Sequence, residues 1–122
     1  DVRKSENILQ ASSLLDKEIT EDLLYEVSAH TDPDKIKSII KKALSGKFIE
    51  SNNEMLKTML DDGLSGIDFI KQLVQEIWNL EIENSKKLRI IEYSGEAEFR
   101  IVEGSDEHLQ LTALLSKIAS LR

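Results

Sequence analysis

The sequence contains no cysteine, which excludes a disulfide framework and a thiolate metal site and suits a reducing, intracellular compartment. One proline and five glycines leave long windows for helices, and nothing shows the tight turn spacing of an all-β chain. Only 5% of the residues are aromatic although 40% are hydrophobic, so a core has to consist mainly of Leu and Ile. No apolar run approaches the roughly 20 residues that span a bilayer, so no membrane contact is expected. The composition predicts an all-α protein.

The charge of the chain is acidic, with a formal net value of −7. This argues against nucleic-acid binding as its main role, because phosphate contacts need clustered lysine and arginine. Two short basic runs, Lys41-Lys42 and Lys86-Lys87-Arg89, are expected to be solvated faces of helices. The 122 residues suffice for one domain, or for one domain with a small appended piece. Because the chain begins at Asp1 without a Met, we expect a fragment of a longer protein.

The stretch from Asp61 to Asp68, with the helix that follows it, organises the chain. Gly63 can take the left-handed conformation that ends one helix, and Ser65 is a favourable N-cap for the next. Asp68 supplies an acidic residue in the first turn, where the helix dipole favours it. The apolar stripe of residues 65–80 is too wide for a helix with one neighbour; it consists of Ile67, Phe69, Ile70, Leu73, Val74, Ile77, Trp78 and Leu80. We predict the central helix of a bundle, with apolar surface left over for a partner.

The residues before this bundle are predicted to form a separate unit. Residues 1–15 have helical periodicity, and a short helical segment follows Thr20. The polar residues 28–31 read as a linker. We therefore predict one unit over residues 1–30 and a helical domain over residues 32–122.

From Asp32 onward, the apolar periodicity predicts about five helices joined by short loops. Asp32 followed by Pro33 is a favoured helix start, whereas Gly46 and Gly104 are expected to end helices. Gly95 lies inside a predicted helix at a cost of roughly 1 kcal/mol, so we expect it to allow a close approach between helices. The predicted helices cover about 33–45, 47–60, 65–80, 84–103 and 106–122.

The chain lacks the side-chain combinations that catalysis needs. His30 and His108 are the only histidines and lie far apart, so no shared metal site is expected. The acidic pairs Asp61-Asp62 and Glu96/Glu98 suit general acid–base work, but they are predicted at a helix end and on a charged helix face. The sequence has no nucleophile-elbow motif and no phosphate-binding loop. We predict that this chain alone is not an enzyme and has no catalytic residue, cofactor or metal.

Two features are not explained by a simple bundle. Arg3 lies in the first turn of the first predicted helix, where the dipole disfavours a cation unless an anion faces it. The run from Glu98 to Gly104, leading into residues 108–111, has apolar and charged residues on both sides of a helix. That mixture suits packing between subunits as well as within one.

Four motifs, in order and at matching spacing, resemble one family. The sensor-2 helix that closes the lid of clamp-loader AAA+ ATPases resembles Asp1-Val2-Arg3-Lys4 with Asn7-Ile8-Leu9-Gln10. The collar domain of replication factor C small subunits resembles Ala43-Leu44-Ser45-Gly46-Lys47-Phe48 and Gly63-Leu64-Ser65-Gly66-Ile67-Asp68. It also resembles Gly95-Glu96-Ala97-Glu98-Phe99-Arg100 and Gly104-Ser105-Asp106-Glu107. The likeness covers nearly the whole chain and favours the archaeal branch.

The resemblance implies that the full-length protein joins other small subunits and a large subunit in a five-membered, DNA-dependent ATPase. That complex opens the ring-shaped sliding clamp (PCNA) and loads it onto primed DNA during replication. Residues 1–30 would be the end of the AAA+ lid, and residues 32–122 the collar that holds subunits together. Arg3 matches the sensor-2 arginine, which faces the phosphate of ATP, with Mg²⁺, only in the full-length protein. The implied location is cytoplasmic in an archaeon and nuclear in a eukaryote.

The surplus apolar surface predicts contacts between collars in a homo-oligomer. The candidate interface residues are Phe69, Leu73, Trp78, Phe99, Leu111 and Leu115. The sequence alone does not fix which helix faces meet. One alternative is a free-standing helical adaptor that binds a helix of another protein in a groove. A weaker alternative is a nucleic-acid module.

Overall fold

The computed structural model describes residues 29–121, and within them it contains five helices and no strand. The helices are α3 (Pro33–Leu44), α4 (Phe48–Asp62), α5 (Gly66–Ile77), α6 (Asn84–Val102) and α7 (Glu107–Ala119). The predicted all-α class and the number of helices after Asp32 are confirmed. The expectations for residues 1–28, including the role of Arg3, fall outside the described residues.

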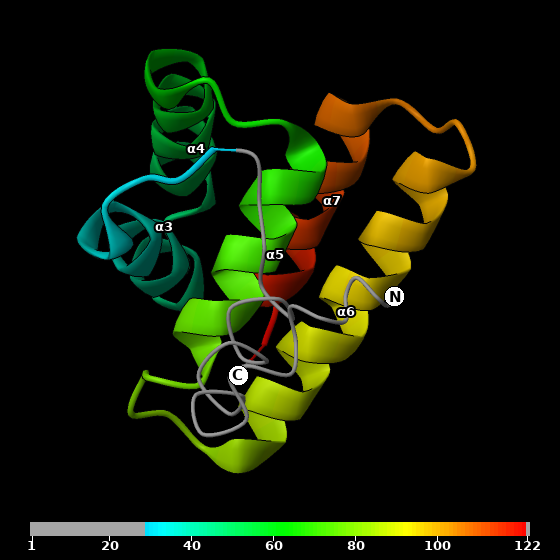
Figure 1. The fold of residues 1–122 in the computed structure, drawn as a ribbon. Helices are drawn as coiled ribbons and strands as arrows, with labels where there is room; N and C mark the ends of the chain where they lie inside the picture. Colours follow the sequence, from blue (N-terminus) through cyan, green and yellow to red (C-terminus); the bar gives the residue numbers. More distant parts are fainter. Residues whose placement is uncertain (1–28, 122) are drawn as a thin grey trace, which may run out of the picture.

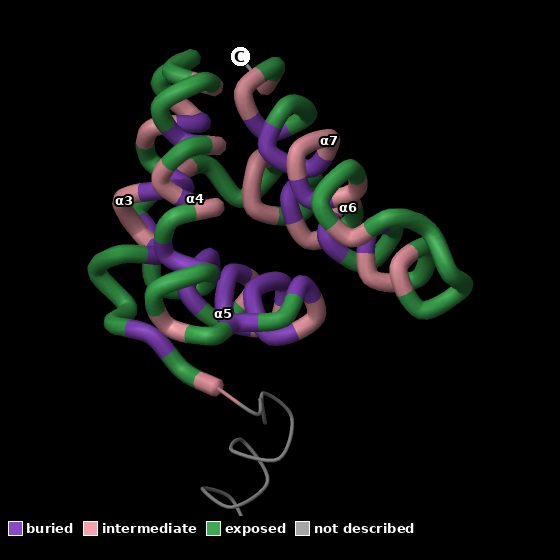
Figure 2. The backbone as a smooth tube through the Cα atoms, turned by 90° about the horizontal axis from the view of Figure 1, so that it is seen from above, coloured by how far each residue is buried: buried purple, intermediate pink, exposed green. Residues whose placement is uncertain are grey.

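The helices form three layers (Figure 1). The antiparallel pair of α3 and α4 occupies one flank and α6 the other, with α5 and α7 between them (Figure 1). α7 packs against all four other helices, and α5 packs against α3, α6 and α7. The predicted central helix α5 therefore shares its position with α7. Buried residues follow the sides of the helices that face this middle layer (Figure 2).

Three predicted helix starts are confirmed by side-chain caps. The carboxylate of Asp32 accepts from the backbone N–H of Asp34 at 2.9 Å, just before the proline at the first position of α3. The hydroxyl of Ser65 accepts from the N–H of Asp68 at 3.1 Å, and Asp106 accepts from the N–H of Leu109 at 2.8 Å. Each cap satisfies one of the N–H groups that a helix leaves open at its beginning.

α6 begins as predicted, after Glu83, but without a side-chain cap. α6 thus starts at the predicted residue but lacks the side-chain cap that α3, α5 and α7 have. At the other end, Gly104 has φ of +109°, and Gly63 after α4 has φ of +66°. Both lie in the left-handed region where glycine carries no penalty, as predicted.

Glycine packing differs from the prediction. A Cβ atom placed on Gly95 would meet no atom within 4 Å, so Gly95 does not mediate a close approach between helices. The close approach occurs at Gly66 instead, where a Cβ atom would lie 2.5 Å from Cγ of Glu107. Gly66 therefore lets the start of α5 pass against the start of α7.

The core is aliphatic, with Phe69 as its one fully buried aromatic side chain among the described residues. Several buried polar groups are hydrogen-bonded: the Ser51 hydroxyl donates to the carbonyl of Ile39 at 2.8 Å, which ties α4 to α3. Gln72 holds Thr31 from both sides, because its amide donates to the Thr31 carbonyl at 2.6 Å and its oxygen accepts from the Thr31 N–H at 3.2 Å. Thr31 thus joins the bundle rather than the linker. In residues 29–121, no helix combines the length and apolarity of a membrane span.

Candidate functional site

The six candidate interface residues separate into two groups. Phe69, Leu73, Leu111 and Leu115 are fully buried in the core of this chain. Proposing them as contacts with another subunit was wrong, because α5 and α7 each pack against at least three neighbours and these side chains fill the space between them. Trp78 and Phe99 are 51% and 64% exposed, so more than half of each side chain lies outside the core.

The outer side of α6 carries an apolar stripe that extends well beyond Phe99. Leu88, Gly95, Phe99 and Val102 are spaced by seven, four and three residues, which places them on one side of a helix. Leu88 and Val102 are 64% and 68% exposed. The opposite side of α6 holds the buried residues Ile90, Ser94 and Ala97. We call the exposed row of Leu88, Gly95, Phe99 and Val102 the α6 stripe.

A groove of about 250 Å³ lies beside the α6 stripe, between α5 and α6. It is lined by Ile70, Lys71, Val74, Ile91, Ser94, Gly95 and Glu98. The space exists partly because Gly95 has no side chain to fill it. The groove extends the apolar surface of α6 toward α5. We call it the α5–α6 groove.

Carboxylates border the α6 stripe. Glu92 and Glu103 are exposed, and Glu98 is half-buried at the edge of the groove. None of the three forms an ion pair within residues 29–121. Glu96, in contrast, pairs with Arg100 at 2.8 Å and with Lys117 at 3.0 Å. The hydrogen bond and charge of Lys117, with the charge of Arg100, hold the pKa of Glu96 below its ordinary value.

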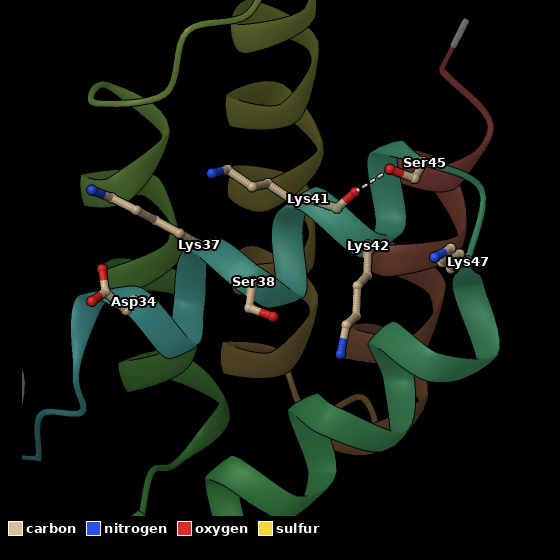
Figure 3. Close-up of a pocket in the computed structure, with 7 residues that line it drawn as sticks. All are labelled: Asp34, Lys37, Ser38, Lys41, Lys42, Ser45 and Lys47. Carbon is tan, nitrogen blue, oxygen red and sulfur yellow. Dashed lines mark hydrogen bonds between the residues drawn. The ribbon is translucent and has the colours of Figure 1, made fainter.

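A basic hollow of about 390 Å³ lies on the outer side of α3 (Figure 3). It is lined by Asp34, Lys37, Ser38, Lys41, Lys42, Ser45 and Lys47. Lys42 turns toward α4, where Nζ lies 2.8 Å from Oε1 of Glu54, and this partner raises the pKa of Lys42 (Figure 3). Lys37 reaches toward Glu76 of α5 at 3.9 Å. Lys41 and Lys47 have no carboxylate partner among the residues that the structure places.

Three of the four carboxylates considered for acid–base chemistry, those of Asp61, Asp62 and Glu96, take part in local ion pairs. Asp61 pairs with Lys57 at 2.8 Å, and Asp62 accepts from the Thr31 hydroxyl and lies 3.4 Å from Lys35. The hydrogen bond from Thr31, with the charge of Lys35, lowers the pKa of Asp62. These contacts hold the end of α4 against the start of the bundle.

Residues 29–121 include no group of three or more His, Asp or Glu side chains that could hold a metal ion. His30 and His108 both lie exposed at the surface. The sequence gives each of them no neighbouring histidine, and the described residues supply no ligand cluster around either.

Sequence reasoning missed two surfaces. The spacing of Leu88, Gly95, Phe99 and Val102 in the sequence indicates the α6 stripe, but only Phe99 was predicted as an interface residue. The basic hollow combines lysines on α3 with Lys47, and only the Gly46 turn brings Lys47 to the others. The signal for it was the pair Lys37 and Lys41, one helical turn apart.

Comparison with known proteins gives a consistent result. A family model described as the replication factor C C-terminal domain matches residues 31–117. Proteins named replication factor C small subunit are similar to this chain in several archaea. The relative from Methanococcus vannielii is 44% identical over 121 residues, which are 99% of this chain and 38% of that protein. The relative from Saccharolobus solfataricus is 42% identical over 98% of this chain and 36% of that protein.

A third relative, from Methanocaldococcus jannaschii, is 40% identical over 98% of this chain and only 6% of its own length. The chain thus spans little more than a third of the relatives from Methanococcus and Saccharolobus. The family model covers most of the described bundle, from Thr31 to Lys117. With its five helices and these matches, the chain belongs to the replication factor C C-terminal domain family.

Proposed function

We propose that this chain is the collar of a clamp-loader small subunit. In this role it holds subunits together in the ring-like ATPase complex that loads the sliding clamp onto primed DNA. The names of the relatives support a place in replication factor C. The observation that carries the collar role is the α6 stripe, a row of apolar side chains on the side of α6 opposite its buried face.

The exposure of several apolar side chains along one side of α6 indicates a binding surface. Single exposed apolar residues are ordinary, whereas a continuous row bordered by charged residues is typical of a protein-binding surface. Its burial against a second chain would remove Leu88, Phe99 and Val102 from water at roughly 25 cal/mol per Å² of apolar surface. The carboxylates Glu92 and Glu103 would stay at the rim.

The proposed partners are other small subunits and the large subunit. The clamp and primer–template DNA would be reached through the whole complex. ATP and Mg²⁺ would bind to the remainder of the full-length protein, since the sequence of this chain has no phosphate-binding loop. Arg3 would face the ATP phosphate there, as the sensor-2 resemblance implies.

The test is a pair of matched substitutions in the full-length protein that carries this sequence. Leu88→Glu places a charge in the α6 stripe, and Leu60→Glu makes the same change at a leucine of α4 that is 83% exposed. We expect Leu88→Glu to weaken subunit association roughly tenfold or more, as for a central interface residue, whereas Leu60→Glu leaves it unchanged. Light scattering after size exclusion, over a concentration series, measures both.

Circular dichroism of both variants serves as the control, because neither side chain contributes to the core and helicity should be preserved. Full assembly of the Leu88→Glu and Phe99→Glu variants would contradict the collar proposal.

The second candidate is a helical adaptor, and the α5–α6 groove favours it. An apolar groove between two helices can receive the apolar side of a partner helix. The two functions differ in a simple observable. An adaptor stays monomeric at all concentrations without its partner, whereas a collar associates with further copies as the concentration rises.

A further inference from the structure

The unpaired charges of the bundle lie on two flanks and have opposite signs. On one flank, Lys41 and Lys47 of the basic hollow have no carboxylate partner in the described chain. On the other flank, Glu92 and Glu103 border the α6 stripe and have no cationic partner there. α5 and α7 separate α3 from α6 (Figure 1), so these groups cannot neutralise each other within one molecule.

We propose that the basic hollow on α3 of one copy of this chain binds the acidic border of the α6 stripe on a second copy. The inference rests on the proposed collar function and specifies which two faces meet. In this proposal, the outer side of α6 of a neighbouring copy occupies the basic hollow.

Charge favours this pairing over the symmetric one. If two α6 stripes met across a two-fold axis, the same surface of both copies would meet. Glu92 and Glu103 of one copy would then lie near the same carboxylates of the other copy and repel them. Two basic hollows would repel for the same reason. Like charges placed together weaken an interface, whereas opposite charges strengthen it and also guide the approach of the partners.

Both faces of the proposed contact have apolar surface. The α6 stripe offers Leu88, Phe99 and Val102. The hollow offers the four-carbon stems of its lysines, which can cover apolar surface while the ammonium groups stay at the rim. Ile49, close in sequence to Lys47, adds an exposed apolar side chain at the start of α4.

The two faces lie on opposite flanks, and this determines the kind of assembly. A contact between unlike faces repeats from copy to copy, and it produces a ring where the rotation between copies closes. The head-to-tail arrangement thus agrees with a collar that holds several subunits in a circle. A symmetric contact through α6 alone would stop at two copies.

The experiment exchanges charges between the two faces in the full-length protein that carries this sequence. The first variant, K41E/K47E, makes the hollow acidic, and the second, E92K/E103K, makes the border of the α6 stripe basic. At low salt, each variant alone should associate roughly tenfold more weakly than the unaltered protein. A one-to-one mixture of the two variants should recover association, because each altered face now finds an oppositely charged partner.

The matched control is K86E/R89E, which reverses two positive charges on α6 away from the stripe, in a hollow shared with Ser120 and Leu121. It should associate like the unaltered protein. Failure of the mixture to recover association would overturn the pairing of α3 with α6. Loss of association in Leu88→Glu with no effect of the charge variants would overturn this inference while leaving the collar function in place.

A final outcome concerns nucleic acid. If K41E/K47E assembles fully but loses retention of a primer–template duplex at low salt, phosphate is the occupant of the hollow and the proposal is overturned. Unchanged retention together with lost assembly supports it.

Discussion

α5 and α6 lie side by side in the bundle and differ in how much of each is buried. Eight of the twelve residues of α5 are buried, whereas only three of the nineteen residues of α6 are. The apolar residues of α5 face α3, α6 and α7, while the stripe of Leu88, Phe99 and Val102 on α6 faces outward. Apolar periodicity thus identifies the sides of a helix that avoid water, but the topology of the bundle decides which of them are covered within one chain.

The strongest way to sharpen this comparison is to truncate one large side chain on each helix. Leu73→Ala on α5 should lower the free energy of unfolding by about 3 kcal/mol, because it leaves a cavity in a fully buried site. Phe99→Ala on α6 should change it by no more than about 0.5 kcal/mol, since this side chain is mostly in water. Urea unfolding followed by circular dichroism measures both.

A large loss for Phe99→Ala in the monomer would show that the α6 stripe supports the fold of a single chain and would break the comparison. Measurement at protein concentrations below the onset of association keeps subunit contacts from contributing to the result.

Local sequence signals predicted the helix boundaries well. Pro33, Ser65 and Asp106 specify helix starts through residues within one turn, and Gly63 and Gly104 specify ends in the same way. Such features depend on neighbours along the chain, so they are visible without a structure.

The candidate site was harder to predict because it depends on contacts between distant segments. The same apolar pattern that suggested Leu73 and Leu111 as interface residues equally describes core residues. Whether such a residue is covered depends on helices that are remote in sequence. Trp78 and Phe99 fit the same apolar pattern, yet more than half of each side chain is exposed.

Glycine gives a second, smaller contrast between α5 and α6. Gly66→Ala should destabilise the bundle by about 1–2 kcal/mol, because its Cβ would press against Glu107 at the start of α7. Gly95→Ala should instead stabilise it by about 0.5–1 kcal/mol, because alanine loses less backbone entropy in a helix and its Cβ meets no atom. Thermal or urea unfolding measures the stability of the two variants relative to the unaltered protein.

The control for this contrast is the double variant G66A/E107A. If the side chain of Glu107 causes the loss at Gly66, its removal should restore most of the stability of the G66A variant. No recovery would place the cause in the backbone at the start of α5.

The smallest expected effect on stability comes from the charge of Asp62, at the end of α4, and not from a charge on α6. The pKa of Asp62 lies below its ordinary value of 3.8, chiefly because the Thr31 hydroxyl donates to its carboxylate, with the charge of Lys35 adding. A carboxylate with a lowered pKa in the folded state stabilises the fold at pH values above its ordinary pKa. This stabilisation disappears as the pH falls through the lower, folded-state pKa.

The unaltered protein should therefore be more stable than the Asp62→Asn variant at about pH 6, and the difference should narrow as the pH falls below about 4. Glu81→Gln, at an exposed position without an ion-pair partner between residues 29 and 121, is the matched control for the loss of one carboxylate charge. Urea unfolding across this pH range measures the difference directly. A constant difference between Asp62→Asn and the unaltered protein would mean that Thr31 is held by Gln72 alone, and that the carboxylate at the end of α4 does not help to fix the start of the bundle.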